Sequence, residues 1–225
     1  QNISATAVRR RGGFVGTGHA GGLQLTSGRL LVPMYGGGGA SYVLASDDHG
    51  ATWRIAGALD GGGEWTLAEV AKGSGRLIAS LRSLTKLRRL EAFSPDGGES
   101  WTGTVASRWL ADEPGGCEGA LLLHPNGKLY FSHPTARFLR QAMSIKVSAD
   151  GGKTWQLHET VWGRGAGCDK PCVPAAGYSS MTLLGDSTES DIGIFYGRNN
   201  VTMAIFEARG MSFTSFRAFT PAVQI

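Results

Sequence analysis

The sequence predicts an all-β fold, a β-propeller built from four-stranded antiparallel blades. Three observations support this prediction. Glycine accounts for 35 of the 225 residues, about twice the usual share of roughly 7%. The sequence has no Gly-X-Y period that would explain the excess, so many tight turns are expected. A turn motif recurs three times, and an apolar hairpin recurs in step with it. Four antiparallel strands repeating every 40 to 50 residues or so are typical of propeller blades.

The composition bounds the class of protein. With 41% hydrophobic and 18% charged residues, the chain fits one globular domain with a proper core, which excludes intrinsic disorder and collagen. No run of about 18 apolar residues and no secretory signal occurs, so no membrane span is expected. The net charge is +4, and its basic blocks, Arg9–Arg11 and Lys86–Arg89, are interpreted as solvated strand faces or loop ends. We therefore expect no nucleic acid partner.

The turn motif reads S-x-D-x-G-x-[ST]-W. Its Asp is expected to accept local backbone hydrogen bonds, its Gly to supply a positive φ, and its Trp to cap the turn with buried area. A strand-like run precedes each copy. The copies begin 48 and then 54 residues apart and lie at Ser46–Trp53, Ser94–Trp101 and Ser148–Trp155.

An apolar hairpin precedes each turn motif, so that each unit contains four strands. The turn glycine lies 18, 19 or 21 residues before the motif serine. A fourth hairpin, Met181–Tyr196, is expected to turn near Asp191–Gly193 and has no Asp motif after it. The sequence thus predicts about four blades, forming a partial propeller over residues 1–225 whose N-terminal blades are missing, in preference to a closed four-blade ring. The first three hairpins are Leu23–Val32, Ala68–Ala79 and Ala120–Phe131.

Strand direction predicts which residues meet. Because blade strands alternate in direction, the segments before the first strands, the ends of the second and the starts of the third lie on one face around the axis. The Asp turns lie on the opposite face and are expected to be structural. The residues expected at the mouth are His19, Glu64, Glu118 and Tyr178, from segments before first strands, and Arg82, His133, Arg137 and Arg140, from the other two positions.

Four of these residues form a recognisable chemical set. Two arginine forks, Arg82 and Arg140, can clamp a carboxylate. Glu64 beside Tyr178 can take the phenolic proton as the tyrosine oxygen attacks. The set suits a sugar whose anomeric carbon bears a carboxylate, because a carboxylate nucleophile would be repelled there. Sialic acid is such a sugar.

At these residues the chain resembles the exo-α-sialidase (neuraminidase) family, which are six-bladed propellers with Asp boxes and a tyrosine nucleophile. The likeness extends over essentially all 225 residues. Beyond the Asp boxes, it is carried by Gly16–Leu25, similar to the family's GPG-x-GIQL, by Gly28–Pro33, by Phe131–Pro134 with Arg140–Met143, and by Gly177–Met181, similar to AYS-[SD]-L.

The resemblance implies a retaining glycoside hydrolase that releases terminal sialic acid from glycoproteins, gangliosides or oligosaccharides. Tyr178 would be the nucleophile, Glu64 its general base, and Arg82 and Arg140 the second and third arginines of a carboxylate-binding triad. The complete protein is expected to be a monomer. A secreted or lysosomal-type compartment is favoured over the cytoplasm, although the sequence itself leaves the compartment open.

The chain also departs from the family pattern. The first triad arginine and the acid/base aspartate of the family belong to N-terminal blades that this chain does not contain. Arg9–Arg11 lie too late for that arginine, and neither Asp112 nor Glu113 is assigned to the acid role. Tyr196–Gly197 stands where the family usually has Tyr-Glu. The site expected in this chain is therefore partial.

Plainer alternatives stay open for several residues. Taken singly, Tyr178 also suits a core position before a buried strand, and Arg82 an exposed strand end. Glu118 is expected to line the pocket rather than act as the base, because its context resembles the family's C-Q-G. Arg140 is preferred to Arg137 because it lies immediately before a strand. His19 and His133 are expected to line the pocket, and Met34, Trp65 and Trp162 to serve in packing.

A second function of another class is a non-catalytic Asp-box propeller that binds glycans or other partners. No metal and no organic cofactor is expected, because the sequence shows neither a ligand cluster nor a phosphate-cradling loop. Three cysteines are too few for a disulfide scaffold. One bridge could join Cys168 to Cys172, or Cys117 to either.

Overall fold

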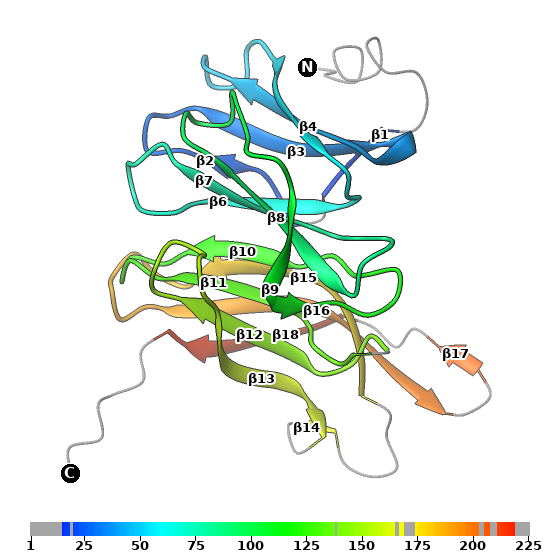
Figure 1. Ribbon diagram of the computed structural model, residues 1–225. Helices are drawn as coiled ribbons and strands as arrows, with labels where there is room; N and C mark the ends of the chain where they lie inside the picture. Colours follow the sequence, from blue (N-terminus) through cyan, green and yellow to red (C-terminus); the bar gives the residue numbers. More distant parts are fainter. Residues whose placement is uncertain are drawn as a thin grey trace.

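The computed structural model describes residues 15–18, 20–137, 139–164, 167–168, 174–202, 205–207 and 211–218. These residues form β-strands, their connections and one short 3-10 helix, η1 (Gly37–Gly39). The strands are arranged in four sheets, which follow one another through the molecule in chain order (Figure 1). The predicted all-β architecture with about four propeller blades is confirmed.

Each blade is a small sheet whose strands follow one another along the chain, and most successive strands are hydrogen-bonded neighbours. The first blade contains β1 (Val15–Thr17), β2 (Leu23–Gln24), β3 (Leu30–Gly36), β4 (Ala40–Ser46) and β5 (Arg54–Asp60), with both β1 and β2 paired to β3. The second contains β6 (Trp65–Glu69), β7 (Leu77–Leu81), β8 (Arg88–Ser94) and β9 (Val105–Ala111). The third contains β10 (Ala120–Leu123), β11 (Leu129–Pro134), β12 (Met143–Ser148), β13 (Gln156–Arg164) and β14 (Gly167–Cys168). The fourth contains β15 (Pro174–Leu183), β16 (Asp191–Thr202), β17 (Ile205–Glu207) and β18 (Met211–Arg217), with both β17 and β18 paired to β16.

The three Asp motifs are the turns between the third and fourth strands of their blades, as predicted. In the first copy Asp48 accepts hydrogen bonds from the backbone N–H of Thr52 at 2.8 Å and from its hydroxyl at 2.6 Å. Gly50 adopts a φ of 88° and donates its N–H to the Ser46 hydroxyl at 2.8 Å. The same contacts recur around Asp96 and Asp150. The Trp53 indole donates to the carbonyl of Gly50 at 3.0 Å, which closes the turn.

The fourth hairpin differs from its expected turn. Its turn comprises residues 184–190, and Asp191–Gly193 are already the first residues of β16, with Ile192 and Gly193 paired to β15. Gly193 is therefore a strand residue, and a Cβ there would lie 2.9 Å from the ring of Phe213. This glycine allows close packing within the sheet rather than a turn, which is why the sequence signal misplaced the turn.

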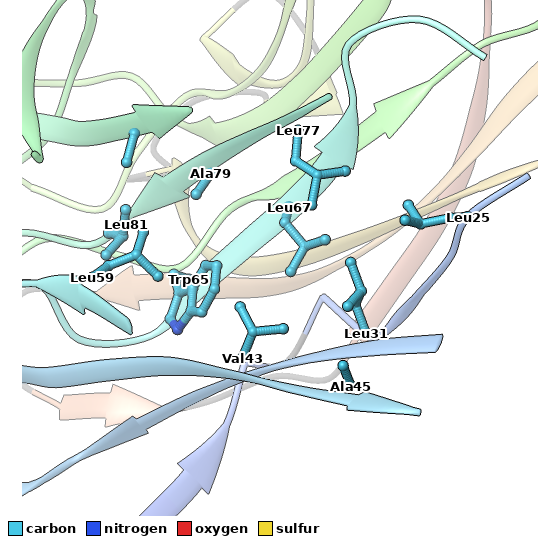
Figure 2. Close-up of a cluster of buried hydrophobic side chains, with 11 residues drawn as sticks. Leu25, Leu31, Val43, Ala45, Leu59, Trp65, Leu67, Leu77, Ala79 and Leu81 are labelled. Carbon is cyan, nitrogen blue, oxygen red and sulfur yellow. The ribbon is translucent and has the colours of Figure 1, made fainter. Parts of the chain in front are cut away.

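Apolar side chains fill the spaces between successive blades. One cluster joins the first two blades, a second joins the second and third, and a third joins the third and fourth. Figure 2 shows the first cluster, with Trp65 and Leu67 of β6 between the residues of β7 on one side and those of β3 and β4 on the other. Trp65 is fully buried, and its indole donates to the carbonyl of Met34 at 2.8 Å, so both residues serve in packing as predicted.

Strands of successive blades also pack directly against one another around one axis. β3 packs against β6, β6 against β10, and β10 against β15. No helix in the part of the chain that the structure describes is long and apolar enough to cross a bilayer.

Candidate functional site

The mouth of the propeller brings together a carboxylate, a phenol and two guanidinium groups from three blades. Glu64 directly precedes β6, Arg82 directly follows β7, and Tyr178 lies in β15. The Tyr178 hydroxyl donates a hydrogen bond to Glu64 Oε1 at 2.9 Å. Arg82 Nη1 donates to Glu64 Oε2 at 2.5 Å and to the Tyr178 oxygen at 3.3 Å. The convergence that strand direction implies for these three residues is thus present in the structure.

Backbone pairing explains why Glu64 and Arg82 face each other. The β6–β7 ladder continues one step beyond both strands, with Arg82 N donating to Glu64 O at 2.9 Å and Gly63 N donating to Arg82 O at 3.0 Å. The two side chains are therefore cross-strand neighbours. Arg82 Nε also donates to Gly115 O at 2.7 Å. With side-chain exposures of 17% for Arg82 and 9% for Glu64, both groups lie at the floor of the mouth.

Arg140 comes from the connection between β11 and β12 and reaches the ring of Tyr178. Its guanidinium carbon lies 5.5 Å from the centre of the Tyr178 ring. Arg140 Nε donates to Glu113 Oε1 at 3.1 Å, and Nη2 donates to Gly116 O at 2.9 Å. Its side chain is 40% exposed, so it remains open to an anionic ligand.

The backbone at Tyr178 is strained. The residue is the extra one in a β-bulge of β15, because Gly177 and Ser179 pair with the adjacent Gly197 and Tyr196. Its φ is 29°, which is rare for an aromatic residue and costs on the order of 1–3 kcal/mol. A bulge re-aims a side chain relative to a regular strand. Here the Tyr178 N–H leaves the ladder and donates to Cys117 Sγ at 3.3 Å.

The environment keeps the phenol of Tyr178 protonated. Burial raises its pKa, and the hydrogen bond and charge of Glu64 raise it further, whereas Arg82 and Arg140 act in the opposite direction. A standing phenolate is therefore disfavoured. What the geometry offers is a protonated phenol with a carboxylate in place to receive the proton.

Three buried charged residues support the mouth, although sequence reasoning assigned a site role to none of them. Asp112 and Glu113 follow β9 and are almost fully buried. Arg89 is fully buried and donates to Ser80 Oγ at 3.1 Å, to Asp112 Oδ2 at 3.4 Å and to the carbonyl of Cys117. The ends of fourth strands also point to the mouth, so the same alternation of strand direction could have identified Asp112 and Glu113.

The interpretation of Lys86–Arg89 as solvated needs correction at its last residue. Lys86 and Arg88 are exposed, whereas Arg89 is buried on the side of the second blade that faces the third, beside the Cys117 carbonyl and the ring of Phe131. The reason is the two-residue alternation of β8, which turns Arg89 toward polar partners that replace its hydration. Arg9–Arg11 lie outside the described residues.

The remaining predicted site residues occupy different places. Glu118 is fully buried, and its Oε1 accepts the Ala20 N–H at 3.0 Å, which ties the third blade to the first. Arg137 is exposed, and the contacts with Tyr178 described above belong to Arg140. His133 is buried in β11 beside Phe131 and does not face an open pocket, because every residue of this central strand is covered by its neighbours. His19 lies outside the described residues. Trp162 is buried in the core between the third and fourth blades.

The structure describes the side chain of one of the three cysteines, Cys117. Cys117 is buried with a free thiol, and burial raises the pKa of that thiol to about 11. The alternative in which Cys117 forms a disulfide is therefore wrong, because its sulfur is enclosed beside Tyr178. The side chains of Cys168 and Cys172 lie outside the described residues. Within the described residues, no group of three or more His, Cys, Asp or Glu side chains is placed to hold a metal ion.

A cavity of about 380 Å³ lies along the axis, away from Tyr178. Its walls are the innermost strands of all four blades, including Leu67–Glu69 and Met181–Leu183. Glu69 is the only carboxylate of the lining residues, and its oxygens accept hydrogen bonds from the backbone N–H groups of Gly73 and Gly75. The cavity is thus a channel between blades, and the reactive groups gather at the mouth.

Four small antiparallel sheets around one axis, three of them with an Asp turn, define an Asp-box β-propeller. Its mouth carries the Tyr178–Glu64 pair together with Arg82 and Arg140. The chain belongs to the BNR repeat-like domain family, whose model matches residues 6–193.

Known proteins similar to this chain are sialidases, which confirms the resemblance seen in the sequence. Sialidase-2 of Cricetulus griseus is 27% identical over 93% of this chain and 57% of its own length. Sialidase-3 of Rattus norvegicus is 34% identical over 48% of this chain and 29% of its own length. The chain thus spans little more than half of the first of these relatives and less of the second.

A solved structure shows the same fold. The intramolecular trans-sialidase from Ruminococcus gnavus, in complex with oseltamivir carboxylate, superposes with a TM-score of 0.70 at 23% identity and covers 91% of this chain and 44% of that one.

Proposed function

We propose that the protein containing this chain is a retaining exo-α-sialidase that releases terminal sialic acid from glycoconjugates. One observation carries the proposal: the Tyr178 hydroxyl donates to Glu64 at 2.9 Å, with Arg82 at the hydroxyl oxygen and Arg140 over the ring. The sialidase relatives support the substrate class.

In this mechanism, Arg82 and Arg140 bind the carboxylate next to the anomeric carbon. Each charge-assisted hydrogen bond contributes on the order of 1.5–3 kcal/mol. The Tyr178 oxygen attacks the anomeric carbon while its proton passes to Glu64 Oε1, and the bond to the aglycone breaks. The aglycone oxygen takes a proton from an acid outside this chain. Water then attacks the anomeric carbon of the tyrosyl-linked sugar, sialic acid leaves, and the phenol regains its proton.

A neutral nucleophile explains the choice of tyrosine. The anomeric carbon carries a carboxylate, which would repel a carboxylate nucleophile. The raised pKa of Tyr178 keeps the phenol neutral while the substrate binds. Glu64 can then act as a general base, a role that typically contributes about 10²- to 10⁴-fold in rate.

We also propose that the chain is part of a larger propeller whose N-terminal blades supply a third arginine and the acid/base aspartate. Exposed aromatic side chains on the fourth blade support this. Phe195 and Phe213 are partners across β16 and β18, and both are exposed. Phe195 alternates along β16 with Ile194, which packs against the third blade. Phe195 and its partner Phe213 therefore lie on the sheet face turned away from that blade. A coding region upstream that contains an early strand arginine and a loop aspartate would agree with this.

Substitution of Tyr178 by Phe tests the function in the protein with all its blades. We expect turnover of an aryl α-sialoside to collapse, while the fold and the affinity for sialic acid persist. Tyr130→Phe is the matched control, because it removes a phenol that donates to Ala218 O at 2.6 Å within the core between the third and fourth blades. Retained turnover in Tyr178→Phe contradicts the assignment of the nucleophile.

A separate experiment tests whether Arg82 and Arg140 form a clamp on the substrate carboxylate. Arg140→Ala should weaken the binding of sialic acid, and unchanged affinity would rule out the clamp. If the complete native protein binds sialic acid but never turns over a sialoside, the non-catalytic Asp-box propeller becomes the better description.

A further inference from the structure

Glu113 contacts the clamp arginine with only one of its two oxygens. Oε1 accepts the hydrogen bond from Arg140 Nε at 3.1 Å. Oε2 is buried and has no hydrogen-bond partner among the described residues. A buried carboxylate oxygen without a donor is costly, and a protonated oxygen can instead donate to a neighbouring acceptor.

The neighbouring acceptor is the carboxylate of Asp112. Asp112 Oδ1 accepts the backbone N–H of Cys117 at 3.1 Å, and Oδ2 accepts Arg89 Nη1 at 3.4 Å. These two donors reach both oxygens of Asp112, whereas Oε2 of Glu113 has none among the described residues. Of two adjacent buried carboxyl groups, the one with an oxygen left without a donor is the better place for the proton. That group is Glu113.

The electrostatics agree with this assignment. Burial raises the pKa of Glu113, and the negative charge of Asp112 and a hydrogen bond with its side chain raise it further. A backbone hydrogen bond and the charge of Arg140 act in the opposite direction.

We propose that Glu113 positions Arg140 as a neutral carboxylic acid, so that the arginine is held over Tyr178 while its positive charge stays available to the carboxylate of the substrate. The inference rests on the proposed sialidase function. An ionised Glu113 would form a full ion pair with Arg140 and compete with the substrate for it. A neutral acid supplies the same hydrogen-bond geometry without that competition.

The proposal implies a pH dependence of substrate binding. As the pH rises through the pKa of Glu113, its carboxylate forms and the affinity for the substrate carboxylate falls. The charged and titratable groups around Glu113 are Asp112 on its own segment, Arg140 from the β11–β12 connection, Arg89 from β8, Cys117 before β10, Arg82 after β7 and Tyr178 from β15. The pKa of the Cys117 thiol is about 11, and the pKa of Tyr178 is raised, so both stay neutral where Glu113 ionises.

The test compares Glu113→Gln with Glu113→Ala in the protein with all its blades. The inhibition constant of free sialic acid is measured against an aryl α-sialoside across a pH series. Glutamine is neutral, accepts from Arg140 and donates to Asp112, so Glu113→Gln should bind within about twofold of the native protein at low pH and lose the decline at high pH. Glu113→Ala should bind about 10- to 100-fold more weakly at every pH. In both variants KM should change more than kcat.

Two outcomes overturn the proposal. If Glu113→Gln binds as weakly as Glu113→Ala at low pH, the negative charge is needed. If the decline at high pH persists in Glu113→Gln, another group causes it. The control variant is Glu159→Gln, an exposed residue of β13, which should keep the native inhibition constant throughout.

A second measurement separates this inference from the proposed function. The ¹³C resonance of the Glu113 carboxyl group, assigned by its loss in Glu113→Gln, should titrate above the range of an ordinary glutamate. A titration within the ordinary range contradicts a neutral Glu113 whatever the substrate is. If Glu113 titrates high but the native protein never binds sialic acid, the proposed function fails while the neutral state of Glu113 stands.

Discussion

Tyr178 in the fourth blade donates its hydroxyl proton to Glu64 in the second, across 114 positions of the sequence. Through this single contact Glu64 influences the ionisation of the phenol. The carboxylate raises the pKa of the phenol both as an acceptor and as a negative charge.

We expect Glu64→Gln to lower the pKa of Tyr178. The amide removes the negative charge, while the charges of Arg82 and Arg140 remain to favour phenolate. Phenolate absorbance during a pH titration measures the effect, with the curve of Tyr178→Phe subtracted to isolate this residue. An unchanged midpoint would show that Glu64 does not contact the phenol in solution.

Gly116 is expected to be intolerant of a side chain. Its φ is 61°, and a Cβ would lie 2.8 Å from both Arg82 Cγ and Ser83 O. Gly116→Ala should reduce the free energy of unfolding by about 1–3 kcal/mol and displace Arg82, because it adds a clash to the backbone strain. Chemical denaturation and sialic acid affinity measure the two effects.

Gly115→Ala is the matched control for this prediction. Gly115 also has a positive φ, 80°, but a Cβ there would meet nothing within 4 Å. It should show the cost of strain alone, on the order of 1 kcal/mol, and keep the native affinity. Equal effects of the two substitutions would mean that the contact with Arg82 is unimportant.

The Asp turns should make stability depend on pH in strongly acidic solution. Hydrogen bonds from the Thr52 side chain and backbone lower the pKa of Asp48 to about 2. Because the folded pKa lies below the unfolded value, the stabilisation is present above the unfolded value of about 4. It is lost as the pH falls through about 2.

Asp48→Asn should therefore flatten the acid limb of a plot of unfolding free energy against pH. The control is Asp186→Asn, at an exposed residue of the 184–190 turn, which should keep the native slope. Identical slopes for native protein and Asp48→Asn would place the acid sensitivity elsewhere.

Much of the fold and part of the site could be predicted from the sequence. The Asp turns are local, since serine, aspartate and glycine within five residues determine their hydrogen bonds. The approach of Glu64, Arg82 and Tyr178 follows from strand direction alone. The first inference needs only the local motif, and the second needs only the order of strands along the chain.

Other features depend on contacts that no local pattern encodes. Arg89 is buried because Ser80, Asp112 and the Cys117 carbonyl meet at one point, and these come from three separate segments. Glu118 is covered because the first blade brings Ala20 onto it. The bulge at Tyr178 depends on the register between β15 and β16, which the sequence of β15 does not specify.

An exposed charge network between the first two blades should add little stability and lose it in salt. Glu99 accepts from Arg29 Nη1 at 2.8 Å and from Arg54 Nη1 at 2.9 Å, with all three side chains partly exposed. Glu99→Gln should reduce the free energy of unfolding by at most about 1 kcal/mol at low salt and by less near 1 M salt. Thermal unfolding at both salt concentrations measures this, with Glu159→Gln as the reference. A large loss that persists in high salt would contradict it.

The bulge at Tyr178 lowers the stability of the fold at the position where the proposed function needs a tyrosine. A left-handed φ suits glycine and penalises tyrosine, so a screen for heat resistance alone would reward replacement of the very residue that we assign as the nucleophile. Directed evolution for thermostability should hold position 178 fixed and gain its improvements elsewhere. In the proposed function the Tyr178 oxygen is the nucleophile, so the strained backbone at this position is the cost of placing that oxygen beside Glu64.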